Sequence, residues 1–219
     1  PGHTLGRDEV GSTAYQTTNQ NLSLALKGGN HLVEAKLGFQ DMPYQNYPNQ
    51  RMDLTENQQW RFNLRHLGSY DWGSLETRAY HEKVNHKMDF GDDKRFWYGA
   101  ASNSGPNGSI GSPCSPISAT CAAGMPMETK SQNSGLTVKA DIMLSPKDLL
   151  RAGAEYQHYT LDDWWPASGG GMWPNEFINI NDGKRDRSAL FGEWEAQLNM
   201  QWKGLLGLRH ETIVMDTGT

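Results

Sequence analysis

Apolar and polar residues alternate along most of this chain, in eight segments joined by links of very different length. The segments cover residues 14–27, 30–40, 58–67, 72–88, 134–144, 149–160, 187–199 and 202–214. In segment 134–144 every second residue is apolar, and these residues are Leu136, Val138, Ala140, Ile142 and Leu144. A period of two predicts β-strands that have one apolar face and one polar face.

The length of the segments and the order of the links indicate a membrane barrel. The segments run to roughly 11–16 residues, whereas ordinary strands cluster near 5–6 residues and about 9–11 tilted residues cross a bilayer. Tight turns alternate with the long links 41–57, 89–133 and 161–186. Outer-membrane barrels have short periplasmic turns and long extracellular loops. The pattern therefore predicts an all-β fold, an antiparallel up-and-down meander of about eight long strands within a larger transmembrane β-barrel.

The same alternation assigns side chains to the two sides of the barrel wall. The apolar positions of segment 134–144 are expected to share the lipid-facing side with Leu206, Leu208 and Val214. The charged positions between the apolar ones are expected to face the lumen. These lumen-facing residues are Arg61, Arg65, Lys139, Arg151, Glu155, Arg209 and Glu211.

Composition limits the partners. The mean hydropathy is -0.73, and the chain contains no run of about 20 apolar residues, so it has no membrane-spanning helix. Barrel strands escape such a scan because only every second residue meets lipid. The net charge of -5 argues against nucleic acid as a partner.

Many aromatic residues lie where a strand meets a loop, as in interface girdles: Trp60, Tyr80, Phe96, Trp97, Tyr98, Trp164, Trp165, Trp173 and Trp202.

We expect the chain to be one piece of a larger barrel. Eight strands can close a small barrel, but such barrels rarely carry a loop as long as 89–133, and no terminal strand ends in an aromatic residue. We therefore expect residues 1–219 to form one partial β-barrel domain, from which a plug domain and further strands are missing.

Three motifs resemble a known family. They are Asn85-His86-Lys87-Met88-Asp89, Gly124-Met125-Pro126-Met127, and the run from Asn181 to Trp194. They resemble TonB-dependent outer-membrane receptors, and within that family they are most similar to the copper-receptor branch. The resemblance implies a plugged barrel of roughly 22 strands in the bacterial outer membrane. It also implies uptake of a metal ion or metal complex, with energy that the inner-membrane TonB complex delivers through an N-terminal plug.

Residue chemistry gives candidate metal ligands. Copper(I) favours thioether and thiolate sulfur, with imidazole as a good partner. His86 and Met88 lie two residues apart on a strand, so both side chains leave the polar face near the outer mouth. Copper would then be the transported ion, with no permanently bound cofactor. Pore-lining polarity is an alternative explanation of His86.

The copper-receptor branch adds a further expectation. There, a His-x-Met pair on a barrel strand meets a Cys-x-x-x-Met pair from the plug, and His86 with Met88 matches the first pair. Cys121 and Met125 have the spacing of the second pair. They lie in a loop after the His-x-Met pair rather than in a plug, which departs from the family pattern. Cys121, Met125 and Met127 are therefore the weaker candidate ligands.

The two cysteines have a competing interpretation. Cys114 and Cys121 are the only cysteines and lie in one loop, and the bacterial envelope is oxidising. A short-range disulfide is the expected state. Such a bond would withdraw the Cys121 sulfur from metal binding, because the thiolate is the ligand.

Signals of catalysis are weak. No Ser-His-Asp motif, phosphate-binding loop or dinucleotide fingerprint is found, and we predict that the chain is not an enzyme. Glu193 and Glu195 are paired carboxylates, but they occupy positions expected to face the lumen. Asp182-Gly183 is a type I′ turn signal.

Other classes of protein remain open from the residues alone. One is a siderophore receptor of the same superfamily, and another is a passive, porin-like channel without a plug. A third is a soluble glycan-binding β-protein whose Trp residues stack on sugars.

Overall fold

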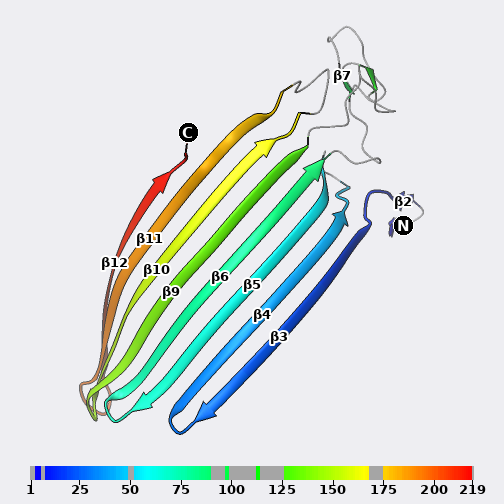
Figure 1. Cartoon of the computed structure of the whole chain (residues 1–219). Coiled ribbons are helices and arrows are strands. Elements are labelled where there is room, and N and C mark those ends of the chain that lie inside the picture. Colours follow the sequence, from blue (N-terminus) through cyan, green and yellow to red (C-terminus); the bar gives the residue numbers. More distant parts are fainter. Residues whose placement is uncertain are drawn as a thin grey trace.

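Eight long antiparallel strands form a single sheet (Figure 1). The computed structural model describes residues 3–5, 8–48, 52–89, 97–98, 112–113, 126–167 and 175–218, with side chains for 11–48, 52–89, 126–167 and 175–218. The long strands are β3 (Tyr15–Gly28), β4 (His31–Gln45), β5 (Asp53–Tyr70), β6 (Gly73–Asp89), β9 (Met127–Ser145), β10 (Asp148–Trp165), β11 (Phe177–Gln197) and β12 (Lys203–Asp216). Two small pairs accompany them, β1 (His3–Leu5) with β2 (Asp8–Val10) and β7 (Trp97–Tyr98) with β8 (Ser112–Pro113).

The strand order confirms the predicted meander. Neighbours in the sheet follow the order β12-β11-β10-β9-β6-β5-β4-β3, so each long strand pairs with the next long strand in sequence. The tight turns between β3 and β4, β5 and β6, β9 and β10, and β11 and β12 gather at one end of the sheet (Figure 1). We call this the turn end and the opposite end, which carries the long links, the loop end. Within the described residues there is no helix of the length and apolarity that a membrane span requires.

The strands are longer at the loop end than the alternation predicts. β4 runs to Gln45, β10 runs to Trp165, and β11 begins at Phe177, so each strand enters a region expected to be a long link. Asp182-Gly183 lies inside β11 rather than in a turn, and Asp182 has a φ of 55° beside a shift in the β10–β11 register. The dipeptide therefore marks a β-bulge, and the predicted type I′ turn is wrong.

The pairing register places side chains on two faces that extend across all eight strands. Arg65 lies opposite Arg78, Arg78 opposite Thr137, and Thr137 opposite Glu155, and opposed residues share a face. All seven residues predicted to face the lumen share this polar face. They are Arg61, Arg65, Lys139, Arg151, Glu155, Arg209 and Glu211. The apolar positions of β9 share the opposite, apolar face with Leu206, Leu208 and Val214.

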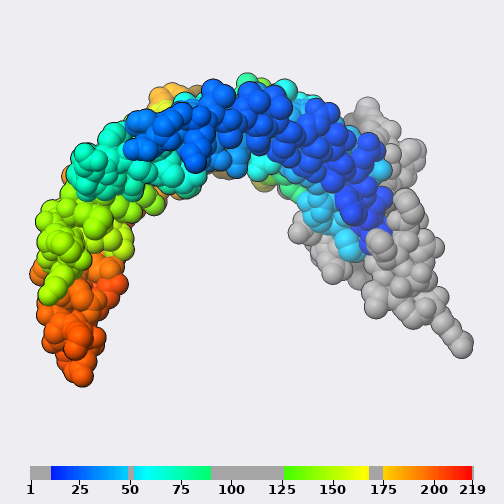
Figure 2. All heavy atoms as spheres, turned by 90° about the horizontal axis from the view of Figure 1, so that it is seen from below, coloured from blue at the N-terminus to red at the C-terminus, as the bar shows by residue number. Residues whose placement is uncertain are grey.

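The sheet curves into an arc (Figure 2), and exposure indicates which face is concave. On the apolar face, Leu144 and Leu190 are 57% and 64% exposed. On the polar face, the side chains of Glu76 and Glu155 are only 20% and 22% exposed. Side chains converge on a concave surface and diverge on a convex one, so the polar face is the inner surface of the arc.

The apolar residues of this face form a band that ends before the loop end of the sheet. On β9 it runs from Leu144 to Leu136, and the next residues on that face toward the loop end are polar: Ser134, Gln132 and Lys130. About 9–11 tilted residues suffice to cross a bilayer, so the band has the height of a membrane core. Leu54, Ala189 and Ala196 are the buried apolar side chains among the described residues. A single sheet has no second layer, and within the described residues the apolar face of this sheet is uncovered.

Candidate metal site

His86 and Met88 lie on β6 at the loop end and on the polar face, as the sequence predicts. His86 is opposite Asn57 of β5 and Thr129 of β9. Met88 is opposite Leu54 of β5 and Met127 of β9. Regular pairing continues along β6 and β9 from Gly73 to Met88, so the alternation that puts Glu76 and Arg78 on the polar face also puts His86 and Met88 there.

Met127 joins His86 and Met88 on the polar face. It is the first residue of β9 and the direct register partner of Met88. Directly opposed residues have Cβ atoms about 4.5–5.5 Å apart, so two thioethers from adjacent strands stand side by side next to an imidazole. The sequence suggested Met127 only as a weak candidate, because it fell within the long link 89–133, whereas the structure places it on β9. We call His86, Met88 and Met127 the rim cluster.

A β-bulge adjoins the rim cluster. Glu56 pairs with Lys87 and Leu54 pairs with Met88, which leaves Thr55 without a partner in the register. A bulge shifts the alternation by one residue, so the buried Leu54 rather than Thr55 stands beside Met88 on the polar face. Met88 is therefore flanked by apolar side chains on both sides.

Two of the five predicted metal ligands belong to residues that the structure does not describe. Cys114, Cys121 and Met125 lie outside the described residues, so the disulfide and the Cys-x-x-x-Met match stay predictions. In the part of the chain that the structure describes, no group of three or more His, Cys, Asp or Glu side chains is suited to hold a metal ion. The rim cluster is of a different kind, since two of its three members are thioethers.

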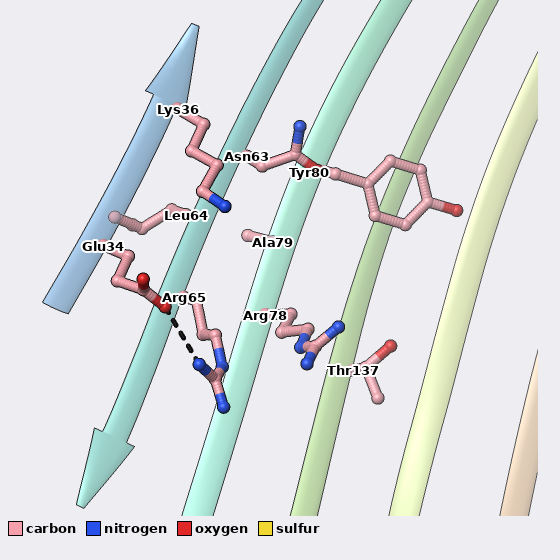
Figure 3. Close-up of a pocket in the computed structure, with 9 residues that line it drawn as sticks. All are labelled: Glu34, Lys36, Asn63, Leu64, Arg65, Arg78, Ala79, Tyr80 and Thr137. Carbon is pink, nitrogen blue, oxygen red and sulfur yellow. Dashed lines mark hydrogen bonds and ion pairs between the residues drawn. The ribbon is translucent and has the colours of Figure 1, made fainter. Parts of the chain in front are cut away.

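Charged side chains below the rim cluster pair with one another across strands. Arg65 of β5 contacts Glu34 of β4 at 2.9 Å and Glu76 of β6 at 2.8 Å, and Arg78 pairs with Glu76. Glu34, Arg65 and Arg78 line a hollow of about 630 Å³ together with Lys36 and Tyr80, as Figure 3 shows. The hollow carries both signs of charge and no concentration of metal ligands.

Two more ion-pair clusters continue the polar face toward β12. Arg151 contacts Glu193 at 2.7 Å and Glu195 at 2.9 Å. Arg209 contacts Glu155 and Glu211, both at 2.8 Å. The paired carboxylates Glu193 and Glu195 are thus bound by one guanidinium, an arrangement that fixes charge on a wall rather than leaving a carboxylate free for proton transfer.

Only part of the predicted aromatic girdle lies on the apolar face. Trp60 lies on that face, is 57% exposed, and has its ring 4.5 Å from that of Phe39. Trp202 is 66% exposed and lies in the turn between β11 and β12. Tyr80 is on the polar face, where its hydroxyl accepts a hydrogen bond from Gln157 at 3.1 Å, so its girdle assignment is wrong. Phe96 and Trp173 lie outside the described residues. The sequence missed the stacked pair Tyr70–Trp72 at the turn end, whose rings are 5.0 Å apart.

The comparison with known proteins gives the class. A model of the TonB dependent receptor-like β-barrel matches residues 2–219, so the chain belongs to the TonB-dependent receptor β-barrel family. Among solved structures it is similar to the copper transporter OprC, with a TM-score of 0.71 and 15% sequence identity. The match covers 93% of this chain and 30% of that one, so the chain spans less than a third of its structural relative. No protein in the curated comparison matches the chain.

Proposed function

We propose that this chain is part of the barrel wall of an outer-membrane receptor that takes up copper. The observation that carries the proposal is the rim cluster, one imidazole and two thioethers that the register brings together on the polar face. Copper(I) favours this soft ligand set, whereas zinc accepts thiolate and imidazole, and magnesium prefers oxygen. The similarity to a copper transporter supports the proposal.

The proposal extends to the whole receptor. The sheet would close with further strands into a barrel, because open edges expose unpaired backbone groups that the bilayer cannot satisfy. The apolar face would meet outer-membrane lipid, the polar face would line the lumen, and the long links would be extracellular. A plug outside residues 1–219 would fill the lumen and couple it to the inner-membrane TonB complex.

The ion pairs of the polar face suit this role. Arg65 and Arg151 are each held by two carboxylates from adjacent strands. Arg209 of β12 is held by Glu211 of its own strand and by Glu155 of β10, across the intervening β11. A wall with its charges paired in this way is suited to line a transport pathway, with copper as the proposed substrate.

Met127 provides the most specific test of the proposal, because the register alone places it beside Met88. In the full-length receptor, Met127→Ala should weaken copper(I) binding by more than the roughly 10–100-fold that loss of an outer-shell partner costs. Binding is measured by competition with a copper(I) chelator. Met143→Ala is the matched control, since Met143 lies on the same strand at the turn end and is 61% exposed. Equal affinity of the two variants would refute the role of Met127.

A further inference from the structure

Asn57 makes a contact with the rim cluster that defines which nitrogen of His86 is available. The Oδ1 atom of Asn57 lies 3.0 Å from Nδ1 of His86, and the two residues are direct register partners on β5 and β6. A carboxamide oxygen accepts hydrogen bonds and cannot donate them. With the Asn57 amide in this orientation, the ring nitrogen that faces Oδ1 is the one that carries the proton.

This hydrogen bond fixes the tautomer of a neutral imidazole. With the proton on Nδ1, the lone pair is on Nε2, and a metal ion binds the nitrogen that has the lone pair. Among the described residues, none is found in hydrogen-bond contact with His86 Nε2. On the other side of His86, the register partner is Thr129 of β9, a residue that carries no charge to pair with the imidazole.

The backbone gives Asn57 its position. Asn57 lies two residues from Thr55, the unpaired residue of the bulge, and pairs regularly with His86 on one side and Met42 on the other. Asn57 and His86 are both half-buried, which restricts the ring and the amide to few orientations. Asn57 thus lies on β5, the strand whose bulge also places Leu54 opposite Met88.

We propose that Asn57 is a positioning residue that holds His86 in the Nδ1–H tautomer, with Nε2 directed to the copper ion. This inference rests on the proposed function, and it deepens that function by separating the residue that orients the ligand from the ligands themselves. A metal-bound histidine commonly donates its second nitrogen to such a partner, which fixes the ring and tunes its basicity.

The test compares two variants of nearly equal size in the full-length receptor. Asn57→Leu removes the acceptor, and Asn57→Asp keeps an oxygen at the same position. The tautomer is read in metal-free receptor in lipid bilayers by ¹⁵N NMR of labelled histidine, with the His86 signal identified by its loss in His86→Ala. Copper(I) affinity is measured by chelator competition.

The wild type and Asn57→Asp should show a protonated Nδ1, and Asn57→Leu should lose this tautomer and bind copper(I) about tenfold more weakly. An unaltered tautomer and affinity in Asn57→Leu would overturn the proposal. Equal losses of affinity in both variants would overturn it too, because they would indicate a packing role.

The same measurements separate this inference from the proposed function. Full copper(I) binding by His86→Ala would refute the copper site itself, and with it any role of Asn57 in copper binding. Loss of binding in His86→Ala together with unaltered binding in Asn57→Leu would refute the role of Asn57 alone.

Discussion

Replacing His86 and Met88 together with Ala is expected to leave the full-length receptor nearly free of copper after purification. The two side chains share the polar face at the loop end and, with Met127, form the rim cluster. Removing both leaves one thioether on the barrel wall, and a single neutral sulfur holds copper(I) poorly beside competing chelators. The measurement is the copper content of purified receptor by mass spectrometry of the metal.

A control at the same height of the wall separates ligand loss from damage to the barrel. Val84 is on the same strand and the same face, two residues before His86, and it has no donor for a metal ion. Val84→Ala should retain the copper of the wild type. Undiminished copper in the double variant would end the proposal that these residues are ligands.

A second large effect is expected where the wall meets lipid. Leu208→Arg should destabilise the full-length receptor in phospholipid vesicles by about 2–4 kcal/mol, the cost of an arginine that faces lipid near the bilayer centre. Leu208 is 80% exposed on the apolar face, so the substitution breaks no packing within the chain. The free energy of unfolding is measured from guanidinium titrations.

The matched variant of this test is Leu205→Arg. Leu205 lies on the same strand, is 62% exposed, and is opposite Glu195 on the polar face. An arginine there would meet water and a carboxylate, and stability should remain close to that of the wild type. If the two arginine variants lose the same stability, the apolar face does not face lipid.

The period of two in the sequence was sufficient to predict the sheet. Tight turns such as that between Gly28 and His31 fix the register of a hairpin, and one-residue slips would move every apolar side chain to the wrong face. The faces of Leu136 and Lys139 therefore followed from sequence. The extra length at the loop end did not. On β9, for example, Glu128–Ser134 is polar on both faces, so the alternation of apolar and polar residues ends while strand pairing continues.

The rim cluster was only half predictable for a related reason. His86 and Met88 could be paired because they are two residues apart on one strand. Met127 follows a long link, and long links do not fix the register of the next strand. The position of Asn57 depends on the bulge at Thr55, whose extra residue has no sign in the sequence pattern.

The most direct test of the copper site is to locate the ion. A crystal of the full-length receptor loaded with copper(I) would be measured at the copper absorption edge, where anomalous scattering marks copper alone. We expect an anomalous peak at the loop end, within bonding distance of His86 Nε2 and the Sδ atoms of Met88 and Met127. A receptor that holds copper elsewhere, with no peak beside these three side chains, would contradict the account.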